Sequence, residues 1–96
     1  MAVLTLVGEL DIATISALLA VVAQILAAGV CRIVLNLAGL GFCDATGLGA
    51  LVSVQRDCVR RGGWIRLASP TDQFRQLLDV AHLNGTMPTY GTLVQA

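Results

Sequence analysis

Residues 32–49 read RIVLNLAGLGFCDATGLG, and this stretch contains the junction on which the fold depends. Its first part, residues 32–37, is a short and nearly continuous apolar run that includes β-branched residues. Such runs are typical of strands that are covered on both faces, as in parallel sheets. A loop follows, and the spacing of the apolar residues after it predicts a helix from about Ala45 to Arg61. The stretch therefore predicts a buried strand that passes through a loop into a helix.

Two more strands and a helix are predicted on either side of this junction. Residues 1–7 alternate as in a strand that Gly8 ends, and residues 64–68 predict a third strand. Between the first two strands, Thr14 is expected to cap a helix that Gly29 ends. The apolar residues of both predicted helices recur three and four positions apart, as on a buried helix face. The first face comprises Ile15, Leu18, Leu19, Val22, Ile25 and Leu26, and the second comprises Leu48, Leu51, Val52, Gln55, Cys58 and Val59.

Residues 69–72 (SPTD) predict the start of a third helix. The serine is expected to cap it, the proline fits its first position, and the aspartate favours the positive end of the helix dipole. Further on, residues 86–90 predict a short last strand and residues 92–96 a final turn of helix. Strands that alternate with helices form right-handed βαβ units. The sequence therefore predicts an α/β fold with a mostly parallel central sheet and helices packed on it.

The length and composition are those of one small domain that spans residues 1–96. The chain is 56% hydrophobic and only 12% charged, which excludes disorder. Its mean hydropathy of +0.81 raises the question of a membrane span. The longest apolar stretch is interrupted by Thr14, Ser16, Gln24 and Gly29, whereas a span needs about 20 strongly apolar residues. A buried helix therefore explains this stretch better than a membrane-spanning one.

Charge and cysteine content narrow the class of protein. Six arginines balance six acidic residues, so no basic surplus is available for binding nucleic acid. The N-terminus lacks a basic segment followed by an apolar run, so no export signal is expected. Three cysteines without a CxxC pair are typical of free thiols in a reducing cytoplasm. With His82 as the one histidine, neither a metal site nor a cofactor is expected.

Two strings in this order and at this spacing resemble a known family. VGELD at residues 7–11 is similar to the turn before the first helix of bacterial STAS domains. FCDATGLG at residues 42–49 is similar to their signature loop, commonly F-x-D-S-[ST]-G-L-G. Residues 32–37 resemble the central strand of these domains, and residues 62–69 resemble their later strand-to-helix junction. The resemblance covers nearly the whole chain and implies the STAS-like fold.

Single STAS domains of this length are mostly anti-sigma factor antagonists, so the resemblance implies a protein-binding module and not an enzyme. It implies binding to an anti-sigma factor that is also a Ser/Thr kinase, which frees a sigma factor to activate transcription. In the family, the kinase switches its antagonist off by phosphorylating the serine directly after the loop aspartate. The positions that match the family's partner-binding segments are Glu9, Asp11, Asp44, Ala45, Thr46, Gly47, Leu48 and Gly49.

The chain departs from the family pattern at three points. Ala45 occupies the phosphoacceptor position and has no hydroxyl, which leaves Thr46 as the remaining acceptor. His82 replaces the glycine that commonly ends the third helix, where it is expected to cap carbonyls or to take a left-handed conformation. The usual extra strand before VGELD is missing, because Gly8 follows Met1 so soon. The first strand would then present an unpaired edge, which predicts a homodimer formed through that strand.

Several of these residues have a structural alternative to a functional role. Asp44 or Thr46 can cap the second helix, and capping is favoured over phosphorylation for Thr46. Asp11, which is expected in a loop together with Glu9, can cap the first helix or contact a partner, and capping is favoured for it. Cys43 precedes a helix N-terminus, where a thiol can be reactive, but buried packing is favoured for it.

Two rival functions follow from these alternatives. One is a structural STAS subunit that holds together a larger signalling or transport assembly, which the missing hydroxyl at Ala45 favours. The other is an enzyme or redox sensor that uses Cys43. Asp11 and Asp44 have the chemistry of an acid–base pair, but no nucleophile or cofactor motif accompanies them. The leading hypothesis is an anti-sigma factor antagonist.

Overall fold

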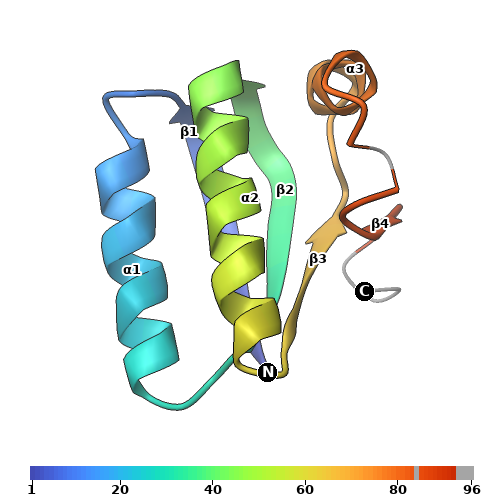
Figure 1. Ribbon diagram of the computed structural model, residues 1–96. Helices are drawn as coiled ribbons and strands as arrows, with labels where there is room; N and C mark the ends of the chain where they lie inside the picture. The colour runs from blue at the N-terminus through green and yellow to red at the C-terminus, as the bar shows by residue number, and fades with distance from the viewer. Residues whose placement is uncertain (84, 93–96) are drawn as a thin grey trace.

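The computed structural model describes residues 1–83 and 85–92, in which strands and helices alternate. In chain order the elements are β1 (Ala2–Leu10), α1 (Ile15–Ala27), β2 (Arg32–Cys43), α2 (Ala45–Arg60), β3 (Trp64–Ala68), α3 (Asp72–Val80) and β4 (Thr89–Tyr90). The strands form one sheet in the order β1-β2-β3-β4, and each neighbouring pair is parallel. Figure 1 shows α1 and α2 side by side over one face of the sheet, with α3 on the side of β3 and β4. The predicted α/β fold with a parallel sheet is confirmed.

The core lies between the sheet and the three helices. Leu35 is a central residue of β2, and the register places it between Leu4 of β1 and Leu67 of β3. Leu35 and Leu67 are fully buried. Each helix adds to the same cluster, through Leu18, Leu51 and Phe74. Because full burial of such a side chain contributes roughly 1.5–3 kcal/mol, this cluster is the main source of stability.

The opposite face of the sheet carries a second set of side chains. Val34 is 1% exposed but lies outside the main core cluster, and the register places it between Val3 and Arg66. The Arg66 guanidinium lies 3.9 Å from the centre of the Trp64 ring. Side chains alternate between the faces of a strand, so these four residues lie on the face away from Leu35. The stacked arginine and tryptophan therefore belong to the face that α1 and α2 leave open.

β1 and β2 extend beyond the ends that the sequence predicted. β1 continues past Gly8 to Leu10, and β2 continues past residue 37 to Cys43. The pairing shifts register twice in this region, and at each shift β2 carries one more residue than β1. Bulges of this kind keep the strands paired through glycine-rich sequence that by itself is typical of a loop. Glu9 is therefore a strand residue, and its predicted place in a loop is wrong.

The buried faces of α1 and α2 match the expected ones with two exceptions. Leu19 is 40% exposed and Val59 is 57% exposed, so their predicted burial is wrong. Val54, which the sequence did not assign to the buried face, is 1% exposed. Both helices carry apolar residues on more than one side, and hydrophobicity alone therefore does not say which of them faces the sheet.

Two of the three helices begin differently from the expectation. Thr14 occupies the N-cap position of α1, but its side chain makes no capping hydrogen bond to the helix. α3 is capped by Thr71, whose Oγ1 accepts a hydrogen bond from the Phe74 N–H at 3.2 Å, so the predicted cap at Ser69 is wrong. Ser69 instead takes a φ of +53° and donates its hydroxyl to the Gly91 carbonyl at 3.2 Å. The proline that follows therefore precedes the helix.

The C-terminal part of the chain adds a short strand and one core residue. β4 covers only the last two residues of the predicted strand at 86–90. His82 takes a φ of +57°, so its expected left-handed conformation is confirmed. Met87, which the sequence analysis did not single out, is completely buried. The helical turn predicted at residues 92–96 lies outside the described residues, apart from Thr92, which is not helical.

α2 approaches the end of β1 so closely that only glycine fits at one position. A methyl group on Gly47 would lie 2.5 Å from the carbonyl oxygen of Leu10 and 2.9 Å from its Cγ. The same carbonyl accepts a hydrogen bond from the Asp44 N–H at 3.2 Å. Asp44 also caps α2, because its Oδ1 accepts a hydrogen bond from the Gly47 N–H at 2.8 Å. These contacts hold the first turn of α2 against the last residue of β1.

A side chain of α3 takes the place of a strand beside the end of β2. The pairing of β2 with β3 ends at Asn36 and Ala68, so β3 does not accompany the last residues of β2. There the Gln73 side chain accepts a hydrogen bond from the Cys43 N–H at 3.0 Å and donates one to the Cys43 carbonyl at 2.7 Å. The amide satisfies both backbone groups, as a neighbouring strand would. α3 is thereby tied to β2 directly before α2 begins.

We expect Gly47→Ala to lower the free energy of unfolding by about 1–3 kcal/mol, because the new methyl group overlaps the Leu10 carbonyl. The matched control is Gly49→Ala in the same helix, where an added methyl group has nothing within 4 Å. This control should raise the free energy of unfolding by about 0.5–1 kcal/mol, the difference in helix propensity. Urea denaturation measures both variants. Equal effects of the two would contradict the close approach.

The substitution Gln73→Ala should lower the free energy of unfolding by about 1–3 kcal/mol, because both backbone groups of Cys43 lose their partner. Gln76→Ala serves as the control, since Gln76 lies exposed on the same helix and should change stability by no more than about 0.5 kcal/mol. Thermal unfolding followed by circular dichroism compares the two. If both variants unfold like the wild type, the Gln73 amide does not act as a substitute strand.

Candidate functional site

The two segments predicted to bind a partner, residues 9–11 and 44–49, meet at one end of the molecule. β1 and β2 are parallel, so their carboxyl ends lie at the same edge of the sheet, at the top of Figure 1. The register pairs Leu10 with Cys43, the last residues of the two strands. Asp11 and Asp44 therefore begin the connections to α1 and α2 from adjacent points. The structure thus brings Glu9 and the residues after it together with the start of α2.

A hydrogen-bonded turn that begins at Asp11 shapes the first segment. The Asp11 Oδ1 accepts a hydrogen bond from the Ala13 N–H at 2.9 Å, and the Asp11 carbonyl accepts one from the Ile15 N–H at 3.0 Å. The Thr14 hydroxyl donates to the Glu9 carbonyl at 2.9 Å and accepts from the Asp11 N–H at 3.0 Å. The Asp11 carboxylate therefore stabilises the turn that leads into α1, whereas the Glu9 side chain is exposed.

The residues of the second segment divide into an exposed and a buried set. The exposed set is Ala45, Thr46 and Gly49, the buried set is Gly47 and Leu48, and Asp44 is intermediate. The buried pair can hold the helix in place but does not form the surface. Because Asp44 caps α2, the capping role predicted for Thr46 is wrong. Thr46 is the second residue of the helix and exposes its side chain to solvent.

Two exposed apolar side chains flank this segment, and the sequence analysis did not single them out. Phe42 is 43% exposed and pairs in register with Glu9, at the end of the sheet. Ile12 is 77% exposed in the turn before α1. Phe42 lies two residues before Asp44, and an apolar residue at this place in the sequence is easily taken for a core residue. Its exposure depends on the side of β2 that it occupies after the register shifts, which local sequence does not indicate.

Cys43 is completely buried, and its surroundings favour the protonated thiol. Burial, together with the negative charge of Asp44, raises the pKa of the Cys43 thiol to about 11. A reactive or redox-sensing cysteine needs a thiolate and access to solvent. These surroundings therefore favour an unreactive thiol, and the expected buried packing of Cys43 is confirmed.

The exposed face of α2 continues from this segment along the whole helix. It consists of residues spaced three and four positions apart, all of them exposed: Thr46, Gly49, Ser53, Arg56 and Arg60. Residues at this spacing are neighbours on one side of a helix. The first turn of α2 and its last turn therefore share one continuous solvent-facing stripe.

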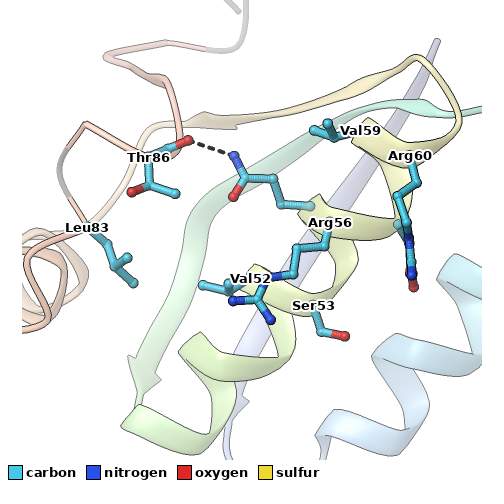
Figure 2. A pocket seen from close by; sticks show the side chains of 9 residues that line it. Val52, Ser53, Arg56, Val59, Arg60, Leu83 and Thr86 are labelled. Carbon is cyan, nitrogen blue, oxygen red and sulfur yellow. Dashed lines mark hydrogen bonds and ion pairs between the residues drawn. The ribbon is translucent and has the colours of Figure 1, made fainter.

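A groove of about 640 Å³ lies beside this stripe, between α2 and the segment that follows α3. Figure 2 shows Val52 and Arg56 on the α2 side, with Leu83 and Thr86 on the other. The two sides are joined where the Gln55 Nε2 donates a hydrogen bond to the Thr86 carbonyl at 2.6 Å. The groove thus combines apolar side chains with a cationic rim.

The two arginines at this groove differ in their pairing. Arg60 forms an ion pair with Asp57 one turn earlier in α2. Arg56 is exposed and has no acidic partner in the part of the chain that the structure describes. The guanidinium of Arg56 is therefore the one at this groove that can meet an external anion without giving up an internal pair.

Within residues 1–83 and 85–92, no group of three or more His, Cys, Asp or Glu side chains is arranged to hold a metal ion. None of the helices in this part of the chain combines the length and the apolarity that crossing a membrane requires.

Comparison with solved structures finds several proteins with the same fold as this chain. A candidate anti-sigma factor antagonist from Thermotoga maritima aligns with a TM-score of 0.87 at 25% identity, over 97% of this chain and 82% of that protein. The anti-sigma factor antagonist SpoIIAA in its unphosphorylated form aligns with a TM-score of 0.81 at 24% identity, over 97% and 81%. A sulfate transporter family protein from Wolinella succinogenes aligns with a TM-score of 0.84 at 18% identity, over 99% and 80%. A comparison with curated proteins found no match.

The family is established by the sequence itself. SpoIIAA and the sulfate transporter family protein, at 24% and 18% identity, are similar in fold alone. The family model for the STAS domain, however, matches residues 1–96, which is the full length of the chain. This match agrees with the parallel sheet and with the junction at which Gly47 seats α2 against β1. The chain belongs to the STAS domain family.

Proposed function

We propose that this chain is an anti-sigma factor antagonist, a binding module that docks on a kinase-type anti-sigma factor in the cytoplasm and frees a sigma factor to activate transcription. The proposal is carried by the docking patch, the exposed residues Ile12, Phe42, Ala45 and Thr46 at the carboxyl ends of β1 and β2. Small residues let a partner approach the helix closely, and an exposed aromatic ring provides an anchor for it. The likeness to the Thermotoga maritima protein supports the same role.

The docking patch is continuous with the exposed stripe of α2 and with its groove. A partner that covers Thr46 and Gly49 would therefore also reach Ser53 and Arg56. Arg56 complements an acidic side chain, while Val52 and Leu83 complement an apolar one. We infer that the partner presents an acidic and apolar segment along α2, with its anchor point at the docking patch.

Phosphoryl control would act at the first turn of α2. Ala45 has no hydroxyl, and the exposed Thr46 is the nearest alternative acceptor. A phosphate at a helix N-terminus is compatible with the helix dipole, so it would not unfold α2. Its charge and bulk would instead obstruct the docking patch. The alanine at the acceptor position supports an antagonist that stays able to bind.

A second candidate function is a structural STAS subunit of a larger signalling or transport assembly. The missing hydroxyl at Ala45 favours it, because a scaffold needs no phosphoryl switch. The two functions differ in what the protein retains from its native cell. A pull-down that yields an ATP-binding anti-sigma kinase supports the antagonist, whereas a scaffold or transporter component supports the structural subunit.

Ala45→Glu should weaken binding to the kinase-type anti-sigma factor by about 1–3 kcal/mol, because it places an unpaired charge in the docking patch. The unfolding temperature should stay nearly unchanged, since an acidic residue is tolerated at a helix N-terminus. Gln76→Glu adds the same charge to the exposed face of α3 and should leave the affinity unchanged. Isothermal titration calorimetry compares the three proteins. Unchanged affinity of Ala45→Glu would exclude the docking patch as the binding surface.

The wild-type chain should accept phosphate from its cognate kinase slowly or not at all, whereas Ala45→Ser should be phosphorylated at the new serine. The two proteins differ only by the hydroxyl at the family's acceptor position. Incubation with the kinase and ATP, followed by mass-spectrometric mapping of modified residues, distinguishes them. Rapid and stoichiometric phosphate on Thr46 of the wild type would overturn the idea of an antagonist without phosphoryl control.

A further inference from the structure

A second groove follows the free edge of β1. β1 is the first strand in the order of the sheet and pairs with β2 along one edge. Along its other edge, no strand of the described residues pairs with it. A groove of about 340 Å³ lies there, between β1 and α1. The consecutive residues Leu4, Thr5, Leu6 and Val7 all line it, although their side chains alternate between the two faces of the strand. The groove therefore runs along the backbone edge of β1 itself.

α1 forms the other wall of this groove, and that wall is apolar. It contributes Ala17, Leu18 and Val21, and Val21 is 40% exposed. Figure 1 shows α1 standing at the β1 side of the sheet, beside α2. Residues 12–30, which include the whole of α1, contain no charged side chain. A helix that faces solvent usually carries charges on its outer side, so α1 has the composition of a covered helix.

Exposed apolar side chains are concentrated in the first 21 residues, which include β1 and the first turns of α1. Nine large hydrophobic side chains are exposed among the described residues, and six of them lie within the first 21 residues: Met1, Val3, Val7, Ile12, Leu19 and Val21. Patches of this kind mark interaction surfaces in a protein that stays in solution. An open strand edge beside an apolar groove is the geometry that accepts an added strand, with main-chain hydrogen bonds at the edge and side chains in the groove.

We propose that this edge and groove bind β1 of a second copy of the chain, so that the two sheets join through antiparallel β1 strands across a two-fold axis at Thr5. In this register Leu4 lies opposite Leu6 of the second copy, on the face toward α1. Both leucines then enter the grooves and contact Ala17 and Val21. On the other face, Val3 lies opposite Val7 of the second copy, which covers two exposed valines at once. Each copy is donor and acceptor, as a two-fold interface requires.

The charges of this side fit a second copy. Residues 1–8 carry no charged side chain, and Glu9 falls at the two opposite ends of the joined strands, where the carboxylates stay apart. The joined strip has the length of α1, about 20 Å.

The test is the oligomeric state of the full chain at micromolar concentration, measured by sedimentation equilibrium. The wild type is expected at twice its mass of 10.0 kDa. Thr5→Lys and Thr5→Glu should each weaken the dimer at least about tenfold, because they place like charges opposite each other at the axis. An equimolar mixture of these two variants should restore the dimer, since a lysine then meets a glutamate. Gln76→Lys, on the exposed face of α3, should sediment like the wild type.

A monomeric wild type would overturn the proposal, because the groove would then take another protein or another segment. A Thr5→Lys variant that stays dimeric, with an unchanged circular dichroism spectrum, would move the interface away from β1. Two monomeric variants that do not combine when mixed would overturn the register centred on Thr5. None of these outcomes depends on the anti-sigma partner, so they leave the proposed function unaffected.

Discussion

The contact between the Leu10 carbonyl and the first turn of α2 is the constraint on which the functional end of this protein depends. That carbonyl ends β1, accepts a hydrogen bond from the Asp44 N–H and lies where any side chain at position 47 would overlap it. A helix displaced from this position would carry Ala45 and Thr46 away from the turn at Asp11. This backbone oxygen therefore fixes the position of the first turn of α2, and with it the residues of α2 that belong to the docking patch.

The same turn is supported from its other side by α3. Gln73 holds both backbone groups of Cys43, so the residue before Asp44 is fixed between β1 and α3. The residues of a binding site are positioned most precisely when they lie on helices or strands that other contacts already hold in place. Ala45 contributes to none of these contacts, because it is exposed and the cap is made by Asp44. The side chain at position 45 can therefore change its chemistry while the fold stays intact.

The sequence predicted the order of the elements, the start of α2 and the burial of Cys43, because each depends on local pattern. It placed the ends of β1 and β2 too early, since glycine-rich segments have low strand propensity and their pairing arises only between the two strands. The role of Gln73 depends on its contact with Cys43, which lies far from it in sequence. The exposure of Phe42 likewise follows from the register shifts. These features are set by tertiary contacts and not by the residues themselves.

The stacking of Arg66 on Trp64 has a consequence for how this protein can be observed. Trp64 is the one tryptophan, and it pairs with the first residue of β2, at the opposite end of the strands from the docking patch. The 16 residues of α2 separate the two ends by about 24 Å. The intrinsic fluorescence of the chain therefore reports on the packing of the open sheet face. It follows unfolding, whereas the docking patch lies at the far end of the strands from this fluorophore.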